Sequence, residues 1–444
     1  MRIRDVEVFE ENGSFVKKDI CVLGERIAES SDYERYEKSE REERYEKSER
    51  DERYEGYEKS ERYERYEKSE RGKRNGRNGR NENDKNDGFS YNAMTEKEIQ
   101  TLRRLQMDCG SLKAIPMLVD IHFHGCDGVD FCDGTEETIS KIAAYELRQG
   151  IGAICPATMT YGEETLTRIA RTAAAHRNRE GADLVGINME GPFISRKKKG
   201  AQNEAFVHRP DAKIFLRLQK EANGLFKLCD LAPEEPGAME MIRELKGQVV
   251  LSLAHTCADY ETAKEAFGAG ASHMTHLYNA MPGITHRMPG PIVAAWEAGA
   301  DVELIADGIH IHPAVVRMTF QLFGDDRVIL ISDSMMATGL PDGQYTLGGQ
   351  DVTVTGNRAV LTQDPGTIAG SATNLMDCFR TAVLSMGIPL GSALKAAAVN
   401  PARCIGIDQE YGSLRPGCYA NILFVNEDLE IKYRMHKGKL TACG

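Results

Sequence analysis

The stretch LVDIHFHGCDG, residues 118–128, ends a short apolar run with two histidines, His122 and His124. In an extended strand alternate side chains point the same way, so both imidazoles would leave one face near the end of a strand. Taken alone, the stretch fits a metal site and fits equally two histidines beside a turn. Its neighbours in the sequence decide between these alternatives.

Seven further apolar runs have the same design, because each ends in polar or charged residues and helical stretches lie between them. These runs are GAICPATMT (152–160), DLVGINMEGPF (183–193), LFKLCDLAPE (225–234), QVVLSLAHT (248–256), ASHMTHLYNAM (271–281), DVELIADGIH (301–310) and DRVILISDSM (326–335). Eight β units that alternate with helices predict an α/β fold, a (β/α)8 TIM-like barrel over residues 116–390. A doubly wound sheet is the alternative, but no Gly-rich dinucleotide loop follows any of these runs.

Both ends of the chain resemble strands. Residues 1–30 contain RIRDVEVFE and FVKKDICVLGERIAE, and residues 391–444 combine a helical stretch with ILFVNEDLEIKYRMHKGKL. Residues 89–115 return to this region and lead into the barrel. We therefore expect the N- and C-terminal strands to form one small β-sandwich domain beside the barrel.

Residues 31–88 are a charged, low-complexity segment in which the unit ERYEKSE occurs at 34–40, 43–49 and 64–70. The segment has almost no aliphatic residues and cannot build a core, which predicts a solvated, disordered insertion. A transient charged helix is compatible with its spacing of Glu and Lys or Arg. A docking segment for a partner is the other alternative.

The composition limits the possible partners and the compartment. The net charge of −12 argues against nucleic acid or an anionic membrane as the main partner. No apolar run is long enough to cross a bilayer and the N-terminus lacks an apolar signal core, so we expect a cytoplasmic protein. The 11 cysteines have no paired spacing, which favours reduced, packed thiols over disulfides or a thiolate metal site.

Active-site groups of a barrel lie at the C-terminal ends of its strands. The chemistry-bearing residues at the predicted strand ends are His122 and His124 (first), Glu190 (third), His255 (fifth), His276 (sixth), Asp307 and His310 (seventh) and Asp333 (eighth). Imidazoles and carboxylates at equivalent positions of several strands predict a metal site. This mixture of ligands suits a divalent Zn, Fe(II), Mn or Co ion better than calcium or magnesium.

The number of ions stays open. The set His122, His124, Glu190, His255 and His276 could hold two ions, because a carboxylate has two oxygens and can bridge them. With one ion, Glu190, His255 and His276 suffice and leave a position open for water, as catalytic sites do. Asp333 is then the natural general base and acid.

The sequence resembles the N-acetylglucosamine-6-phosphate deacetylases of the amidohydrolase superfamily. The resemblance rests on DIHFHGCDG, NMEGPF, KKKGAQN, AHT, THLYNAMPGITHR, IADGIH, ISDSM and TIAGSATN, over residues 116 to 420. It implies hydrolysis of the N-acetyl group of N-acetylglucosamine 6-phosphate in amino-sugar catabolism, by a homodimer with one or two divalent ions per subunit. Alternatives are N-acetylgalactosamine-6-phosphate deacetylation, cyclic amide hydrolysis and a catalytically inactive scaffold.

The resemblance also implies residue roles. Glu190, His255 and His276 match the metal ligands, and Asp333 matches the catalytic acid and base. The residues that would line the sugar-phosphate pocket are Ala201, Asn279, Ala280, Arg287, Asp307, His310, Ile368, Ala369 and Gly370. Arg287 would clamp the phosphate, since a guanidinium forks onto anionic oxygens. One departure is Gln202, which stands where some members have a histidine.

Overall fold

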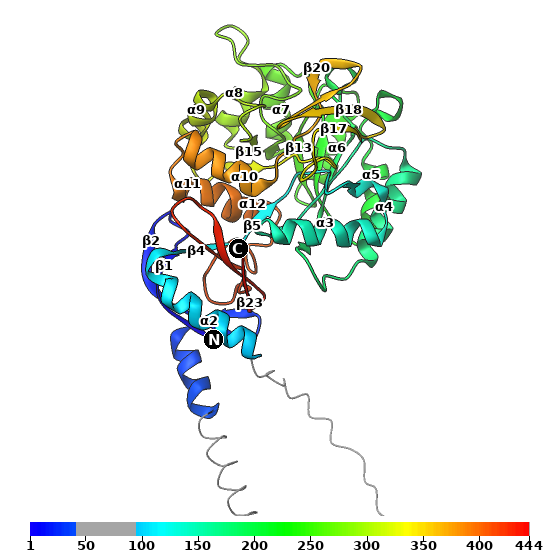
Figure 1. Ribbon diagram of the computed structural model, residues 1–444. Helices are drawn as coiled ribbons and strands as arrows, with labels where there is room; N and C mark the ends of the chain where they lie inside the picture. The colour runs from blue at the N-terminus through cyan, green and yellow to red at the C-terminus, as the bar shows by residue number, and fades with distance from the viewer. Residues whose placement is uncertain (41–94, 444) are drawn as a thin grey trace, which may run out of the picture.

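The computed structural model describes residues 1–40 and 95–443, and a parallel (β/α)8 barrel forms its larger part (Figure 1). Eight strand units succeed one another in chain order, and the second and third units are each broken in two. The units are β5 (Leu118–Asp120), β8 with β9 (Ile151–Ile154, Ala157–Thr158), β10 with β11 (Asp183–Leu184, Ile187–Phe193), β12 (Phe226–Leu231), β13 (Val250–Leu253), β14 (His273–Met274), β15 (Asp301–Ile305) and β16 (Val328–Ile331). The predicted fold is therefore confirmed.

The barrel closes where the last unit meets the first. The amide of Asp333 donates to the carbonyl of His122 (2.9 Å), and the amide of His124 donates to the carbonyl of Ser334 (2.7 Å). These bonds lie just beyond β16 and β5, so closure occurs at the strand ends that carry the predicted site. A short hairpin of β6 (Gly125–Cys126) and β7 (Val129–Asp130) follows the first unit.

One helix follows each strand unit and covers the outside of the barrel. The helices are α3 (Glu136–Arg148), α4 (Glu163–Ala175), α5 (Ala212–Glu221), α6 (Ala238–Leu245), α7 (Tyr260–Ala269), α8 (Gly290–Ala298), α9 (Pro313–Phe323) and α10 (Leu375–Arg380). Several begin at a side chain that caps the first turn: Thr135 accepts from the amide of Thr138, and Asp259 from that of Thr262. Their apolar faces bury residues such as Ile139 against the strands.

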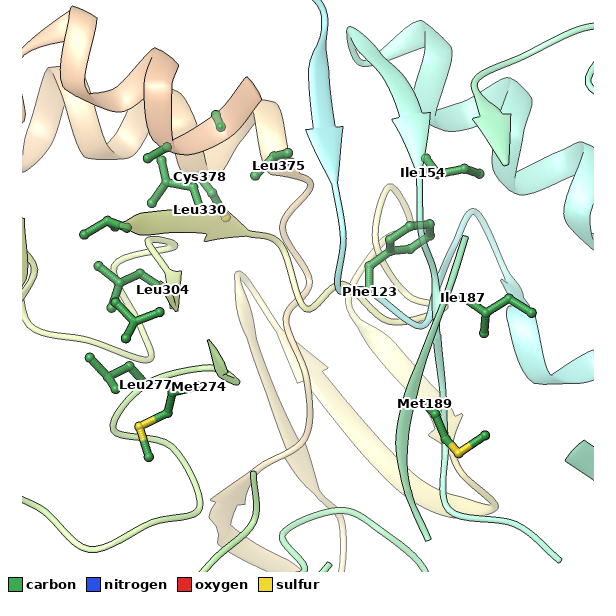
Figure 2. Packing of buried hydrophobic residues seen from close by; sticks show 14 of the residues in the cluster. Phe123, Ile154, Ile187, Met189, Met274, Leu277, Leu304, Leu330, Leu375 and Cys378 are labelled. Carbon is green, nitrogen blue, oxygen red and sulfur yellow. The ribbon is translucent and has the colours of Figure 1, made fainter. Parts of the chain in front are cut away.

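Alternate residues of each strand serve two different cores. Leu304 and Leu330 belong to the core that the outer helices cover, and Leu330 lies near Leu375 and Cys378 of α10 (Figure 2). The side chains that fill the barrel interior include Val119, Ile121, Leu228, Ile305, Ile329 and Ile331. Strands that are buried on both faces need apolar residues on both, which explains why the sequences of these strands are nearly continuous hydrophobic segments.

Strands from both ends of the chain form the small β domain, as predicted. They make one seven-stranded sheet in the order β23-β22-β21-β4-β1-β2-β3. The strands are β1 (Arg2–Phe9), β2 (Phe15–Leu23), β3 (Arg26–Ala28), β4 (Lys113–Pro116), β21 (Ile422–Val425), β22 (Ile431–His436) and β23 (Lys439–Ala442). Helix α2 (Glu96–Asp108) adds Leu105 to the core of this sheet, and Figure 1 shows the domain below the barrel.

Three details differ from the sequence prediction. The helical segment that opens residues 391–444, containing α11 (Leu390–Leu394) and α12 (Asn400–Cys404), packs Ala402 against the barrel interior rather than joining the β domain. Residues 30–40, at the start of the segment predicted to be disordered, are helical, and residues 41–88 lie outside the described residues.

No helix in residues 1–40 and 95–443 is both long and apolar enough to cross a membrane.

The third difference is an antiparallel sheet between β16 and α10, near the mouth of the barrel (Figure 1). Its strands are β17 (Gly343–Leu347), β18 (Gln350–Thr355), β19 (Arg358–Leu361) and β20 (Asp364–Ile368). The amide of Ala369, just after this sheet, donates to the carbonyl of Ala359 (3.1 Å). The sheet thereby places the turn at residues 368–370 near the barrel mouth, where the sequence predicts the sugar-phosphate pocket.

Candidate metal centre and active site

The barrel mouth gathers two groups of side chains with metal-ligand chemistry. One group is His122, His124 and Asp333, and the other is Glu190, His255 and His276. Within each group the ligand atoms lie within 4.8 Å of one another, and all six residues are buried. The structure thus brings together every metal ligand predicted from the sequence, with Asp333 beside them.

Glu190 lies between the two groups. Its Oε1 is 3.0 Å from His255 Nε2 and 3.1 Å from His276 Nε2, and its Oε2 is 3.3 Å from His124 Nε2. The Nε2 of His122 is 3.5 Å from Oε1. Glu190 therefore lies within reach of imidazoles from both groups, so its two oxygens could serve more than one ion.

Asp333 faces the first group from the end of the eighth strand unit. Its Oδ1 is 3.3 Å from His124 Nε2 and 3.8 Å from His122 Nε2. His255, His276 and Asp333 all have positive φ angles, of 43°, 28° and 47°. Such conformations cost energy in non-glycine residues and concentrate at functional sites.

Neighbouring groups orient the ligands through their second polar atom. The Nδ1 of His255 donates to the carbonyl of Lys198 (2.8 Å), which leaves Nε2 for Glu190. Gln202 donates from Nε2 to Glu190 Oε2 (2.5 Å) and accepts from the amide of Thr160 (2.7 Å). Gln202, the departure noted in the sequence, thus holds the central carboxylate.

Burial and neighbouring charges have opposite effects on the pKa values of the residues in this centre. Burial alone would raise the pKa of Glu190, but the imidazoles of His122, His124 and His255 hold that pKa well below the usual carboxyl range. Burial would lower the pKa of His124, but Asp333 and Glu190 raise it to about 10. The pKa of Asp333 is lowered, mainly by the hydrogen bond and charge of the histidines against the effect of burial.

The residues present fit a divalent metal. The Nε2 of His122 is buried and has no hydrogen-bond partner among the described residues, although it lies next to two carboxylates. Buried nitrogen donors with no protein partner are expected where an ion completes the site, and imidazole with carboxylate suits Zn, Fe(II), Mn or Co.

A cavity of about 380 Å³ opens onto these ligands. Residues predicted to bind the sugar phosphate that line it are Ala201, Asn279, Ala280, His310, Ile368 and Gly370. Three others do not: Ala369 is fully buried, Arg287 is exposed in the loop before α8, and Asp307 lies behind His310. The Oδ2 of Asp307 accepts from His310 Nδ1 (2.7 Å), so Asp307 orients a cavity residue.

Other lining residues were not singled out from the sequence. They are Met159, Lys197, Lys198, Gly200, Tyr278, Leu347, Gly366 and Thr367. The KKKG run could have indicated the two lysines, since it supplies clustered positive charge directly after the Glu190 strand. Among the described residues that line the cavity, the two with cationic side chains are Lys197 and Lys198.

The amidohydrolase family matches residues 114–441. The chain belongs to the amidohydrolase family. Among amidohydrolases, an N-acetylglucosamine-6-phosphate deacetylase of Bacillus subtilis (strain 168) is 37% identical over 73% of this chain and 84% of its own length. An N-acetylgalactosamine-6-phosphate deacetylase of Escherichia coli O157:H7 is 34% identical over 74% of this chain and 87% of its own. The predicted resemblance is confirmed.

Solved structures of deacetylases are also similar to this chain. A mutant N-acetyl-D-glucosamine-6-phosphate deacetylase from Mycobacterium smegmatis, in complex with N-acetyl-D-glucosamine-6-phosphate, is 34% identical, with a TM-score of 0.70 over 75% of this chain and 87% of that one. The deacetylase from Thermotoga maritima covers 100% of both chains with a TM-score of 0.72 at 21% identity, which shows the fold.

Proposed function

We propose that this amidohydrolase hydrolyses the N-acetyl group of N-acetylglucosamine 6-phosphate to acetate and glucosamine 6-phosphate. The observation that carries the proposal is the position of Asp333, beside a buried imidazole–carboxylate centre and on the wall of a cavity that contains two lysines. The deacetylase relatives, at 37% and 34% identity, support the same reaction.

Glu190, His255 and His276 would hold one divalent ion, and His122, His124 and Asp333 could hold a second, with Glu190 between them. When bound, such a metal polarises the amide carbonyl and lowers the pKa of water toward neutrality. The protein itself holds these six side chains buried and close together at the barrel mouth. Neutral imidazoles and an ionised carboxylate are the forms that bind a divalent cation, so metal binding would displace protons from the centre.

Asp333 is the proposed general base and acid. Its lowered pKa keeps the carboxylate ionised at neutral pH, so it can accept a proton from the attacking water. The water oxygen bonds to the acetyl carbon, the C–N bond then breaks, and Asp333 returns the proton to the leaving amine. Acetate and the free amine result.

His310 and the lysines would bind the rest of the substrate. Because Asp307 occupies Nδ1 of His310, only Nε2 is left to face a ligand, and it can donate to the acetyl oxygen as charge develops there. Lys197 and Lys198 supply positive charge on the cavity wall for the phosphate. The predicted clamp, Arg287, is proposed from the resemblance alone.

The test is acetate release from N-acetylglucosamine 6-phosphate, with bound metal quantified on the same sample. N-Acetylgalactosamine 6-phosphate is assayed in parallel, because one relative acts on that epimer by name, and a cyclic amide such as dihydrouracil covers the third possibility. Faster turnover of either alternative would overturn the proposed substrate. The homodimer and the cytoplasmic location stay predictions.

A further inference from the structure

Glu303 is a fully buried carboxylate that the proposed chemistry does not use. It lies in the middle of β15, where its neighbours Leu304 and Ile305 belong to the apolar cores. Burying a carboxylate costs several kcal/mol unless hydrogen bonds or charges offset the loss of water. Its contacts therefore indicate what it does.

One oxygen of Glu303 contacts both groups of the metal centre. Oε2 accepts from Nδ1 of His122 (2.9 Å) and from the backbone amide of His276 (3.0 Å). His122 belongs to the group with His124 and Asp333, and His276 belongs to the group with Glu190 and His255. Glu303 is thus a physical link between the two groups, from beneath the barrel mouth.

The contact with His122 decides which nitrogen that ring presents. With Nδ1 donating to Glu303, Nε2 is the atom left to face Glu190 and Asp333, at 3.5 and 3.8 Å. The contact with His276 is made by its backbone amide. His276 has a φ of 28°, an energetically costly conformation that this hydrogen bond helps to stabilise. Two N–H groups point at the same oxygen, so Oε2 of Glu303 is the acceptor in both contacts.

We propose that Glu303 is a positioning residue, which orients His122 and supports the strained His276 and thereby sets the affinity of the centre for a divalent ion. The inference rests on the metal centre of the proposed function, whatever acyl sugar is the substrate. Outer hydrogen bonds to ligating histidines typically account for 10–100-fold in metal affinity. Glu303 contacts two predicted ligands at once, so the effect of its loss should fall within that range.

The experiment measures affinity of the full-length protein for Zn²⁺ by competition with a chromophoric chelator, without substrate. Glu303→Leu removes the acceptor at similar volume, and we expect binding about 10–100-fold weaker than in wild type. Glu303→Gln keeps a carbonyl oxygen that can accept both bonds, and it should retain affinity within a few-fold. Unchanged affinity in Glu303→Leu would overturn the proposal.

The matched control is Glu146→Leu, because Glu146 is also a buried carboxylate but contacts no ligand histidine in the described hydrogen bonds. A merely structural role for Glu303 would lower the unfolding midpoint of both variants and leave Zn²⁺ affinity intact, which would also overturn the proposal. If Glu303→Leu does not fold, Glu303→Asp draws the acceptor back by one methylene and decides the question: wild-type affinity refutes the role, and weaker binding supports it.

Failure of this inference and failure of the proposed function are distinguishable. A protein that deacetylates no amino-sugar phosphate would refute the function, while the Zn²⁺ comparison would still decide the role of Glu303. Conversely, a deacetylase whose Zn²⁺ affinity is the same in Glu303→Leu and wild type would keep its function and lose this inference.

Discussion

The backbone amide of Asp333 donates to the carbonyl of His122 at 2.9 Å, so the bond that closes the barrel also joins the proposed acid and base to the metal centre. The side chains of the same two residues lie 3.8 Å apart. The fold and the chemistry therefore depend on the same junction of β5 and β16. A change that loosens this junction should affect closure and catalysis together, whereas a side-chain change at Asp333 should affect the site and leave closure intact.

Asp333→Asn should abolish turnover. The amide keeps the shape of the side chain but cannot accept a proton, so we expect a fall in kcat of about 10²–10⁴-fold or more. Acetate release and metal content are measured on the same sample. Metal at Glu190, His255 and His276 should persist, and near-normal activity with metal bound would refute the role.

His122→Gln combined with His124→Asn should reduce the metal content from two ions per chain to one. The variant loses both imidazoles that face Asp333 Oδ1, while His255 and His276 keep their contacts with Glu190 Oε1. Stoichiometry is measured by elemental analysis after dialysis. If wild type and variant both hold one ion, the binuclear interpretation is wrong.

Lys197→Ala with Lys198→Ala should raise KM for the phosphorylated sugar about tenfold or more, because a hydrogen bond to a charged group contributes about 1.5–3 kcal/mol. Turnover of unphosphorylated N-acetylglucosamine should change little, since it lacks the phosphate. The matched control is Lys213→Ala with Lys220→Ala, on the outer helix α5.

Arg287→Ala, assayed beside the lysine variant, separates the two phosphate assignments. A larger KM effect from Arg287 than from the lysines would support the role implied by the resemblance. The opposite order would favour the residues that line the cavity. Equal turnover of phosphorylated and unphosphorylated sugar by wild type would contradict both assignments.

Asp183→Asn should destabilise the contact between barrel and β domain. Lys437 Nζ donates to Oδ1 of Asp183 (2.7 Å) and the Tyr411 hydroxyl donates to Oδ2 (2.9 Å). The variant removes the negative charge that pairs with the Lys437 ammonium group. We expect a loss of about 3 kcal/mol in the free energy of unfolding at pH 7. Urea unfolding measures it, with the exposed Asp428→Asn as control.

The effect of Asp183 should depend on pH. Burial would raise its pKa, but the nearby His436 imidazole and the hydrogen bond and charge of Lys437 lower the pKa below the usual value. A depressed folded pKa stabilises the protein above the unfolded value of about 3.9, and the contribution is lost as pH falls through the folded pKa. The gap between wild type and Asp183→Asn should thus be constant from pH 7 to about 5 and narrow below about 4. A gap that widens in acid would contradict this assignment.

Local sequence patterns were sufficient to predict the barrel and to place the predicted metal ligands at its mouth. Strand periodicity is short-range, and the ends of parallel strands must share one edge of a barrel, so His255 and His276 could be placed together from separate runs. The same logic missed Glu303. It lies inside an apolar run rather than at its end, and only its lone charge among buried neighbours indicated a role.

The sequence by itself determined the order of strands and helices, the shared face of His122 and His124, and the chemistry of the mouth, because each depends on backbone periodicity and residue type. Only the tertiary structure decided which cavity wall carries Lys197 and Lys198 while Arg287 stays outside, and that Glu303 reaches both His122 and His276. Those relations depend on loop course and on strand register across the barrel. Both are set by packing between segments far apart in the chain, which no local pattern encodes.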